Sequence, residues 1–373
     1  MKRRSKKTPF MTAKPSFLSR YCLDGWLLLN LMALMIIGCF ILYSAKQDWL
    51  LVERQGLRFL LAMLLMIAIA QIPPNFLRPF AVWFYGIGIA LVVLVLILGD
   101  VSKGGQRWLS VGFFRFQPAE LLKIAVPLYL AHFLSLRELP PNRAVTFFAL
   151  GLIALPALLV AKQPDLGTAI LIGCTGFLTL FFAGLSFRFL AALFALGLAA
   201  SPIVWYFMHD YQRQRILTLL NPESDPLGAS YHIIQSKIAI GSGGVYGRGW
   251  LQGTQSQLDF LPERSTDFVF AVLGEEFGLI GALVLLAAYL LLLGRGFWIS
   301  AKAPDSFTRL LAGSITGALF VYIFVNIGMV TGLLPVVGVP LPLISYGGSS
   351  MVTLMASFGI LMSIATHKRL LPS

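Results

Sequence analysis

The sequence predicts an all-α integral membrane protein with about ten transmembrane helices. Of its 373 residues, 57% are hydrophobic and only 12% are charged, whereas a soluble domain carries roughly 25% charged residues. Mean hydropathy is positive, and many apolar runs reach the roughly 20 residues that a helix needs to cross a bilayer. We therefore expect a single polytopic membrane domain over residues 1–373.

The apolar runs place the predicted spans in order along the chain. The first run is too long for the hydrophobic region of a signal peptide and has no clear small-residue cleavage site, so we expect it to be retained. The predicted spans lie near residues 26–44, 57–72, 79–98, 118–135, 145–161, 167–185, 189–207, 268–294, 309–330 and 349–365.

Basic residues predict the orientation of these spans. Residues 1–25 contain a basic tail, MKRRSKKTPFMTAK, and basic residues beside a span favour the cytoplasmic side. An even number of spans then places both termini in the cytoplasm. The tail supplies much of the net charge of +13, and without an aromatic-and-basic binding module it indicates no nucleic-acid partner. With this orientation the basic residues of the short connections also lie inside: Arg78, Arg137, Arg143, Arg188, Arg295, Lys302, Lys368 and Arg369.

Longer segments are predicted on the opposite, periplasmic side. Residues 99–117 form one, and residues 208–267 form a large loop between the seventh and eighth spans. Within that loop, HIIQSKIAI (232–240) predicts a short amphipathic helix on the membrane surface. GSGGVYGRG (241–249) has no preceding strand and no G-K-[ST], so its glycines indicate a tight chain path rather than a phosphate loop. The prolines of LLPVVGVPLPLISYGGSS predict a re-entrant loop before the last span.

Charged residues at the ends of spans are candidate functional groups, because charges inside membranes are costly and usually face the interior of the bundle. In RFQPAELLKIAVP, Glu120 and Lys123 share a helical face and follow Gln117. They form either a pair that neutralises itself or part of a site. In KQPDLGT, Asp165 either caps the next helix or takes part in function, and the two roles are compatible.

The stretch LPERSTDFVFAVLGEE brings further acids to the eighth span. Thr266 and Asp267 could cap this span, but Asp267 also lies at the mouth of the bundle, where an acid can meet a water-soluble group while the rest of a ligand stays in lipid. Glu275 and Glu276 lie deeper, and we expect them to pair with basic residues of neighbouring spans.

Long motifs in this order resemble the SEDS family (shape, elongation, division and sporulation proteins). The resemblance runs from the first span to the last, and the HDYQRQR segment and PVVGVPLPL loop resemble its elongation branch. One departure is Ser265, where relatives often carry histidine. The motifs are RFQPAELLKIAVP, QPDLGTAIL, YQRQRILTLLNPESDPLGASYHIIQSKIAIGSGG, LPERSTDFVFAVLGEE and LLPVVGVPLPLISYGGSS.

The resemblance implies a peptidoglycan glycosyltransferase for cell elongation and rod-shape maintenance. It would polymerise lipid II into β-1,4 glycan on the periplasmic side of the bacterial cytoplasmic (inner) membrane. Asp267 would be the catalytic residue, a general base in an inverting reaction. Cations would hold the leaving pyrophosphate. The other positions tied to activity in the family, expected to bind the substrate, match Arg54, Arg115, Gln117, Glu120, Lys123 and Asp165.

Cofactors and partners are also expectations from the resemblance. A divalent cation, Mg or Mn, is left open with its ligands unknown, since the four histidines and three cysteines lack metal-ligand spacing. No organic cofactor is expected. Besides lipid II, the expected partners are a class B penicillin-binding protein, which is a transpeptidase, and other elongation-complex membrane proteins.

The alternative function is a lipid II flippase, because transporters also use buried polar residues within a bundle of spans. Against it, the motifs concentrate on one face and no inverted repeat is visible. The hypothesis of a purely structural scaffold is weaker, because it assigns no function to the polar residues.

Overall fold

The computed structural model describes residues 22–102, 105–111, 114–208, 210–221, 230–258, 260–261 and 263–367. A helix covers each predicted apolar run. Six of these helices (α2, α4, α6, α12, α13 and α14) are long and apolar enough to cross a membrane, while α7 and the Phe187–Ile203 part of α8 are shorter apolar helices. The prediction of a helical membrane protein is confirmed. The bundle helices are α2 (Gly25–Lys46), α3 (Trp49–Ala70), α4 (Pro74–Leu98), α5 (Pro118–Ser135), α6 (Arg143–Ala161), α7 (Leu166–Phe182), α8 (Phe187–Phe207), α12 (Val269–Ala301), α13 (Ser306–Thr331) and α14 (Ser349–Thr366).

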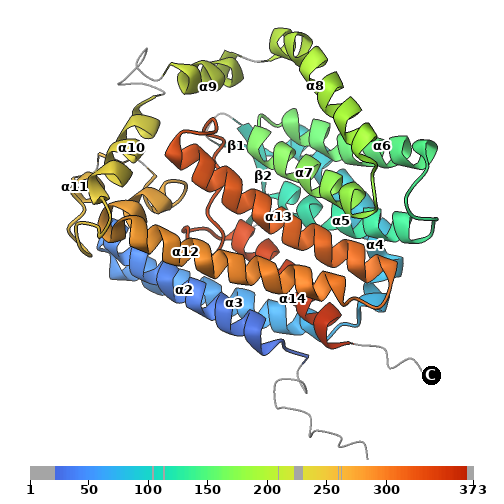
Figure 1. Ribbon diagram of the computed structural model, residues 1–373, viewed down its shortest axis with the longest axis horizontal. Helices are drawn as coiled ribbons and strands as arrows, with labels where there is room; N and C mark the ends of the chain where they lie inside the picture. Colours follow the sequence, from blue (N-terminus) through green and yellow to red (C-terminus); the bar gives the residue numbers. More distant parts are fainter. Residues whose placement is uncertain are drawn as a thin grey trace, which may run out of the picture.

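Between α8 and α12, the described residues form three further helices, α9 (Asp210–Leu220), α10 (Tyr231–Gly243) and α11 (Thr254–Gln257). Figure 1 shows α10 and α11 gathered at the end of the bundle opposite the start of α2 and the end of α14. The helix predicted over 232–240 is therefore present as α10. It packs on protein as well, because Ser236 is fully buried and its hydroxyl donates to the carbonyl of Val330 on α13, at 2.8 Å.

A short antiparallel sheet follows α4 and was not anticipated from the sequence. Its strands, in the order β1-β2-β3, are β1 (Asp100–Ser102), β2 (Gly105–Val111) and β3 (Phe114–Phe116). Val101 pairs with Gln106, and Ser110 pairs with Arg115. The sheet leads the chain back to the start of α5 at the same end of the bundle.

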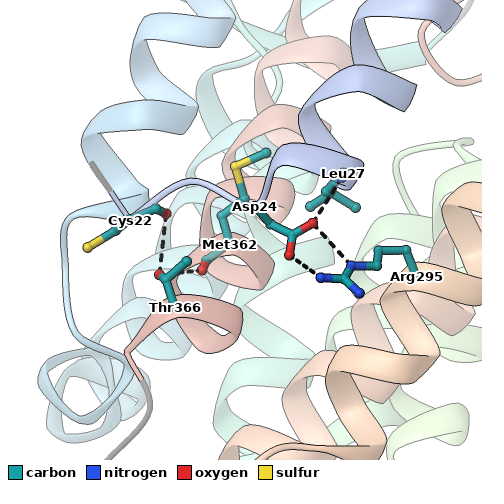
Figure 2. A network of polar contacts seen from close by, with 6 residues as sticks. All are labelled: Cys22, Asp24, Leu27, Arg295, Met362 and Thr366. Carbon is teal, nitrogen blue, oxygen red and sulfur yellow. Dashed lines mark hydrogen bonds and ion pairs between the residues drawn. The ribbon is translucent and has the colours of Figure 1, made fainter. Parts of the chain in front are cut away.

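Polar contacts join the chain ends at the other end of the bundle (Figure 2). Arg295 on α12 forms an ion pair with Asp24, whose carboxylate also caps α2 by accepting from the amide of Leu27 at 3.0 Å. The hydroxyl of Thr366 on α14 donates to the carbonyls of Cys22, at 3.3 Å, and Met362, at 2.8 Å. The start of α2 is thereby fixed against both α12 and α14.

The segment between α13 and α14, residues 332–348, is not helical, and most of its middle part is buried. The prediction of an irregular loop before the last span is confirmed in this respect. Backbone groups away from water need partners inside the protein. Here the hydroxyl of Tyr289 donates to the carbonyl of Pro342 at 2.6 Å, and the Nδ2 of Asn326 donates to the carbonyl of Val339 at 2.7 Å.

Helix α12 is broken at Gly278, whose φ of +63° and ψ of −157° define an extended conformation that is essentially restricted to glycine. The loop after α10 supplies the backbone partners that the break removes. The amides of Arg248 and Gly249 donate to the carbonyls of Glu275 and Glu276, each at 3.0 Å, while the amide of Leu279 donates to the carbonyl of Gly244, also at 3.0 Å. This contact confirms the tight chain path predicted for residues 241–249.

Substitution of Gly243 tests the close approach of α10 to α12. A Cβ at Gly243 would overlap the carbonyl oxygen of Gly274, whereas a Cβ at Gly241 would meet nothing within 4 Å. We expect Gly243→Ala to destabilise the protein by about 1–3 kcal/mol, lowering the midpoint of thermal unfolding in detergent.

Gly241→Ala is the matched control on the same helix, and it should leave the midpoint unchanged or raise it, because alanine favours helix over glycine. Equal midpoints for the two variants would contradict the close packing of these two helices.

Candidate active site

Asp267 lies in a turn immediately before α12. Within this turn, the amides of Thr266 and Phe268 donate to the carbonyl of Glu263 at 3.0 and 3.3 Å. The helix begins at Val269 with Phe268 in the N-cap position. The cap is therefore one residue beyond Thr266 and Asp267, which corrects that sequence-based interpretation of the pair.

The irregular segment 332–348 holds the backbone of this turn. The amide of Tyr346 donates to the carbonyl of Ser265 at 2.8 Å, and the hydroxyl of Ser345 donates to the carbonyl of Thr266 at 2.5 Å. The Nδ2 of Asn326, which binds the carbonyl of Val339, also donates to the carbonyl of Asp267, at 2.9 Å. Three consecutive carbonyls before α12 are thus fixed from outside the turn.

The Asp267 side chain is partly exposed and faces the irregular segment. A Cβ built on Gly338 would lie 3.5 Å from its Oδ2 atom, and Gly338 has φ +74°. A glycine at this position therefore brings the chain close to the carboxylate without a side chain beside it. The carboxylate is therefore partly accessible and not fully buried.

A second polar cluster joins the starts of α5 and α7. The Nε2 of Gln117 donates to the Oδ2 of Asp165 at 2.7 Å, while the Oδ1 of Asp165 accepts from the amide of Thr168 at 3.2 Å. The predicted capping role of Asp165 is confirmed. Both partners in the Gln117–Asp165 bond are buried, at 9% and 7% exposure, so the pair fastens α5 to α7.

Glu120 and Lys123 form the predicted pair on α5. Their Nζ and Oε1 atoms are 2.7 Å apart, and the Lys123 ammonium also lies 5.1 Å from the centroid of the Tyr322 ring on α13. Tyr322 borders two small cavities, of about 30 and 20 Å³, and Lys123 lines the larger one. Such spaces hold a water molecule and are too small for a sugar.

The irregular segment connects the two polar clusters. Gly167, two residues after Asp165, lies against the carbonyl of Val337, where a Cβ would stand only 2.6 Å from the oxygen. The next residue, Gly338, faces Asp267 as described above. The starts of α7 and α12, each with its acid, therefore border the same short stretch of chain.

Helix α3 contributes arginines beside the irregular segment. It starts eight residues earlier than the predicted span, at Trp49 rather than residue 57, so Arg54 lies in a helix, where it is exposed. One turn further, the Arg58 guanidinium lies 4.5 Å from the centroid of the Tyr346 ring. The Nε2 of Gln55 donates to the carbonyl of Ser345 at 3.4 Å. Sequence reasoning missed Arg58, although its spacing of four from Arg54 indicated a shared helical face.

Arg115 is the one candidate whose side chain lies outside the described part of the structure. Its backbone belongs to β3 and pairs with Ser110 on β2. This places residue 115 just before Gln117 and the start of α5, on the same end of the bundle as the other candidates.

Among the residues that the structure describes, no basic side chain binds Glu275 or Glu276, so that prediction is wrong. The Glu275 carboxylate accepts from the amides of Gln255 and Ser256, at 2.8 and 3.2 Å. Glu276 accepts from the hydroxyl of Ser44 on α2. Both acids are buried, and they fasten α11 and α2 to α12 through hydrogen bonds instead of ion pairs.

His232 on α10 lies beside the same turn. Its ring stacks on that of Phe268, with 5.7 Å between centroids and 18° between planes. Burial lowers the pKa of His232, and the Glu263 carboxylate opposes this shift in part. The lowered pKa favours the neutral ring, which packs on Phe268 without adding a positive charge near Asp267.

Metal ligands were left unassigned from the sequence. Within the ranges that the structure describes, no group of three or more His, Cys, Asp or Glu residues is placed to hold a metal ion. The described donor set therefore does not fit a dedicated all-protein metal site.

These features define a polytopic helical membrane protein with two polar clusters at one end of its bundle, one around Asp267 and one around Asp165 and Glu120. Comparison with known proteins identifies the class further. The chain matches the FtsW/RodA/SpoVE family, described as "Cell cycle protein", over residues 21–370. The chain belongs to this family, which confirms the resemblance drawn from its motifs.

Individual relatives agree with this assignment. Peptidoglycan glycosyltransferase MrdB of Escherichia coli (strain K12) is 55% identical over 360 residues, which covers 96% of this chain and 97% of that protein. A chain of a peptidoglycan synthase complex is 32% identical with a TM-score of 0.81, covering 92% of this chain and 97% of that one. Rod shape determining protein RodA of Thermus thermophilus is 31% identical with a TM-score of 0.69, covering 92% and 96%.

The Glu120–Lys123 pair offers a test of the second cluster. Lys123→Met leaves a buried carboxylate without its cation, which typically costs about 3–5 kcal/mol. We expect a large drop in the midpoint of thermal unfolding in detergent. Glu120→Gln combined with Lys123→Met removes both charges and should recover a large part of that drop.

Both variants lose the Lys123 ammonium, but only the single variant leaves the Glu120 carboxylate buried without a cation. A difference in stability between them therefore reports the ion pair and not the loss of a substrate-binding group. A double variant as unstable as Lys123→Met alone would contradict the coupling between the two residues.

Proposed function

We propose that this chain polymerises lipid II into β-1,4 glycan strands, with Asp267 as the general base. The class of activity, peptidoglycan glycosyltransferase, is that of the 55% identical relative, which aligns over 96% of this chain. One observation supports the role of Asp267 above the others. It is a partly exposed carboxylate whose backbone is held by Asn326, and whose neighbouring carbonyls are held by Ser345 and Tyr346.

The proposed topology has ten helices crossing the bacterial cytoplasmic (inner) membrane, with both termini inside. The sheet, helices α9–α11 and the turn at Asp267 then belong to the periplasmic side, and residues 208–267 form the large loop after the seventh span. The basic residues at the opposite end support this orientation, because Arg143 and Arg188 lie in the first turns of α6 and α8 and Lys302 follows α12. The water-soluble part of the substrate would meet the protein on the periplasmic side.

The proposed reaction inverts the configuration at the anomeric carbon of the donor sugar. The 4-hydroxyl of the acceptor attacks that carbon from the face opposite the pyrophosphate, the carbon–oxygen bond to the pyrophosphate breaks, and the hydroxyl proton passes to Asp267. A general base of this kind contributes about 10²–10⁴-fold to the rate. Inverting sugar chemistry needs the base on the opposite side from the leaving group.

The leaving pyrophosphate carries developing negative charge, which arginine and lysine stabilise. We assign this task to Arg54, with Arg115 and Lys123 as further candidates. Arg58 lies one turn from Arg54 and fixes this face of α3 against Tyr346. Gln117, Glu120 and Asp165 would act by holding α5 and α7 beside the irregular segment, and not by touching the reacting atoms.

A divalent cation, Mg or Mn, would arrive on the pyrophosphate of the substrate, because such ions are bound through substrate phosphates and only one or two carboxylates. No step of the mechanism is assigned to it. A class B penicillin-binding protein is the proposed partner. Supporting this, a chain of a peptidoglycan synthase complex shares the fold with a TM-score of 0.81.

The flippase alternative has one specific observation in its favour, the broken α12, because discontinuous helices are common in transporters. However, the loop at residues 244–249 satisfies the backbone at the break, so the break needs no substrate or ion to complete its hydrogen bonds. Purified protein in detergent has no membrane sidedness, and glycan made under those conditions excludes flipping as the sole activity.

The base assignment is tested by Asp267→Asn. With purified lipid II and the partner transpeptidase present, we expect glycan polymerisation, followed by gel separation of the strands, to fall by about 10²–10⁴-fold. The midpoint of thermal unfolding should stay within a few degrees of that of the unchanged protein.

Asp305→Asn is the matched control. Asp305 caps α13 by accepting from the amide of Thr308 at 2.7 Å, and asparagine caps helices about as well as aspartate. This variant should polymerise normally. Normal polymerisation by Asp267→Asn would refute Asp267 as the base.

A further inference from the structure

A cavity lies at the end of the bundle opposite Asp267, between the first turns of α6 and α8. Its volume is about 920 Å³, and it is bounded by Pro140 and Arg143 on one side and by Gly184 and Arg188 on the other. A second cavity of about 280 Å³ shares Pro140 and Gly184 and reaches Arg309 on α13. The larger one falls in the size range of ligand pockets.

Three guanidinium groups border these cavities. Arg143, Arg188 and Arg309 are all exposed, and none of the ion pairs within the described ranges involves them. The acids nearest in the chain do not neutralise them. Asp305 uses its carboxylate to cap α13, and Glu138 is exposed on the connection before α6. The cavities therefore carry a net positive rim.

The helices themselves add to this positive character. Helices α6, α8 and α13 all begin beside the cavities, and the first turn of a helix carries the positive end of its dipole. One amide in each first turn is already taken by a capping side chain, from Asn142, Ser186 and Asp305. Backbone amides and arginine forks are both suited to phosphate oxygens.

The wall behind the arginines is apolar. Phe147 and Phe187 line the larger cavity and are 62% and 83% exposed, and the rings of Phe147 and Phe189 meet at 5.9 Å. Farther along α8 most of the described side chains are exposed, and Figure 1 shows α8 leaning away from the body of the bundle. A molecule with a phosphate head and a hydrocarbon tail matches this arrangement, in which an arginine rim is followed by an apolar wall.

We propose that this cavity binds an anionic phospholipid from the leaflet on the side of the chain termini. Its phosphate lies between Arg143 and Arg188, with Arg309 at the rim, and one acyl chain runs along Phe147 and Phe187 between α6 and α8. Basic pockets between spans on the cytoplasmic side are known to take acidic lipid headgroups. Arginines that merely orient the spans would need no apolar cavity behind them.

Native mass spectrometry of the purified full chain, titrated with phosphatidylglycerol or phosphatidylethanolamine, tests this site. We expect preferential retention of phosphatidylglycerol. Each lost arginine should weaken its binding by roughly fivefold, so Arg143→Gln with Arg188→Gln should weaken it by about 25-fold. Lys302→Gln removes a charge from the same end of the protein but lines neither cavity, and it should change binding by less than about twofold.

A second variant separates the cavity from general surface charge. Ala192 lines the larger cavity, so Ala192→Trp fills it and leaves every charge in place. We expect this variant to lose phosphatidylglycerol binding as well. Unchanged binding by Ala192→Trp, or an equal loss in Lys302→Gln, would overturn the proposal in favour of diffuse attraction to the basic surface.

Unfolding midpoints measured without added lipid show whether each variant is folded. If the double arginine variant does not fold, Arg188→Gln and Arg309→Gln alone provide the same comparison, each with an expected loss of about fivefold. Neither variant touches Asp267 or its neighbours, so the outcome is independent of the proposed glycan polymerisation.

Discussion

The structure depends on satisfying the backbone of a non-helical segment inside a membrane bundle. Between α13 and α14, the carbonyls of Val339, Pro342 and Ser345 accept from Asn326, Tyr289 and Gln55, which belong to three different helices. Where no water is available, each such group left without a partner costs several kcal/mol. The segment can remain irregular only because α3, α12 and α13 are placed around it.

This constraint explains why the candidate active site lies where it does. The same segment that needs partners also supplies them, since Ser345 and Tyr346 hold the turn that carries Asp267. Its stretch at Val337 and Gly338 separates the start of α7 from that turn. An acid at a helix start would otherwise move with a flexible connection. Here its backbone is fixed by the core while its carboxylate stays partly exposed.

Local sequence patterns were sufficient to predict the spans and the irregular segment. They also predicted the pairing of Glu120 with Lys123, because residues three apart on a helix share a face. They were insufficient where a partner is distant in sequence. Gln117 and Asp165 are 48 residues apart, and Asn326 is 59 residues from Asp267. Their meeting depends on how helices pack, which periodicity does not encode. For the same reason, the prediction that Glu275 and Glu276 pair with basic residues was wrong.

The most direct test of this account is the rate of lipid II polymerisation by Asn326→Leu, a change of similar size that leaves Asp267 itself intact. The carbonyls of Asp267 and Val339 then lose their shared donor, at a cost of about 1–3 kcal/mol for each unsatisfied group. The account predicts that kcat falls at least about tenfold while KM changes little, as expected when only the transition state loses stabilisation. Thr331→Val, on the same helix, should leave both constants unchanged. An unchanged kcat in a folded Asn326→Leu protein would contradict the claim that Asn326 positions Asp267, the proposed base, against the irregular segment.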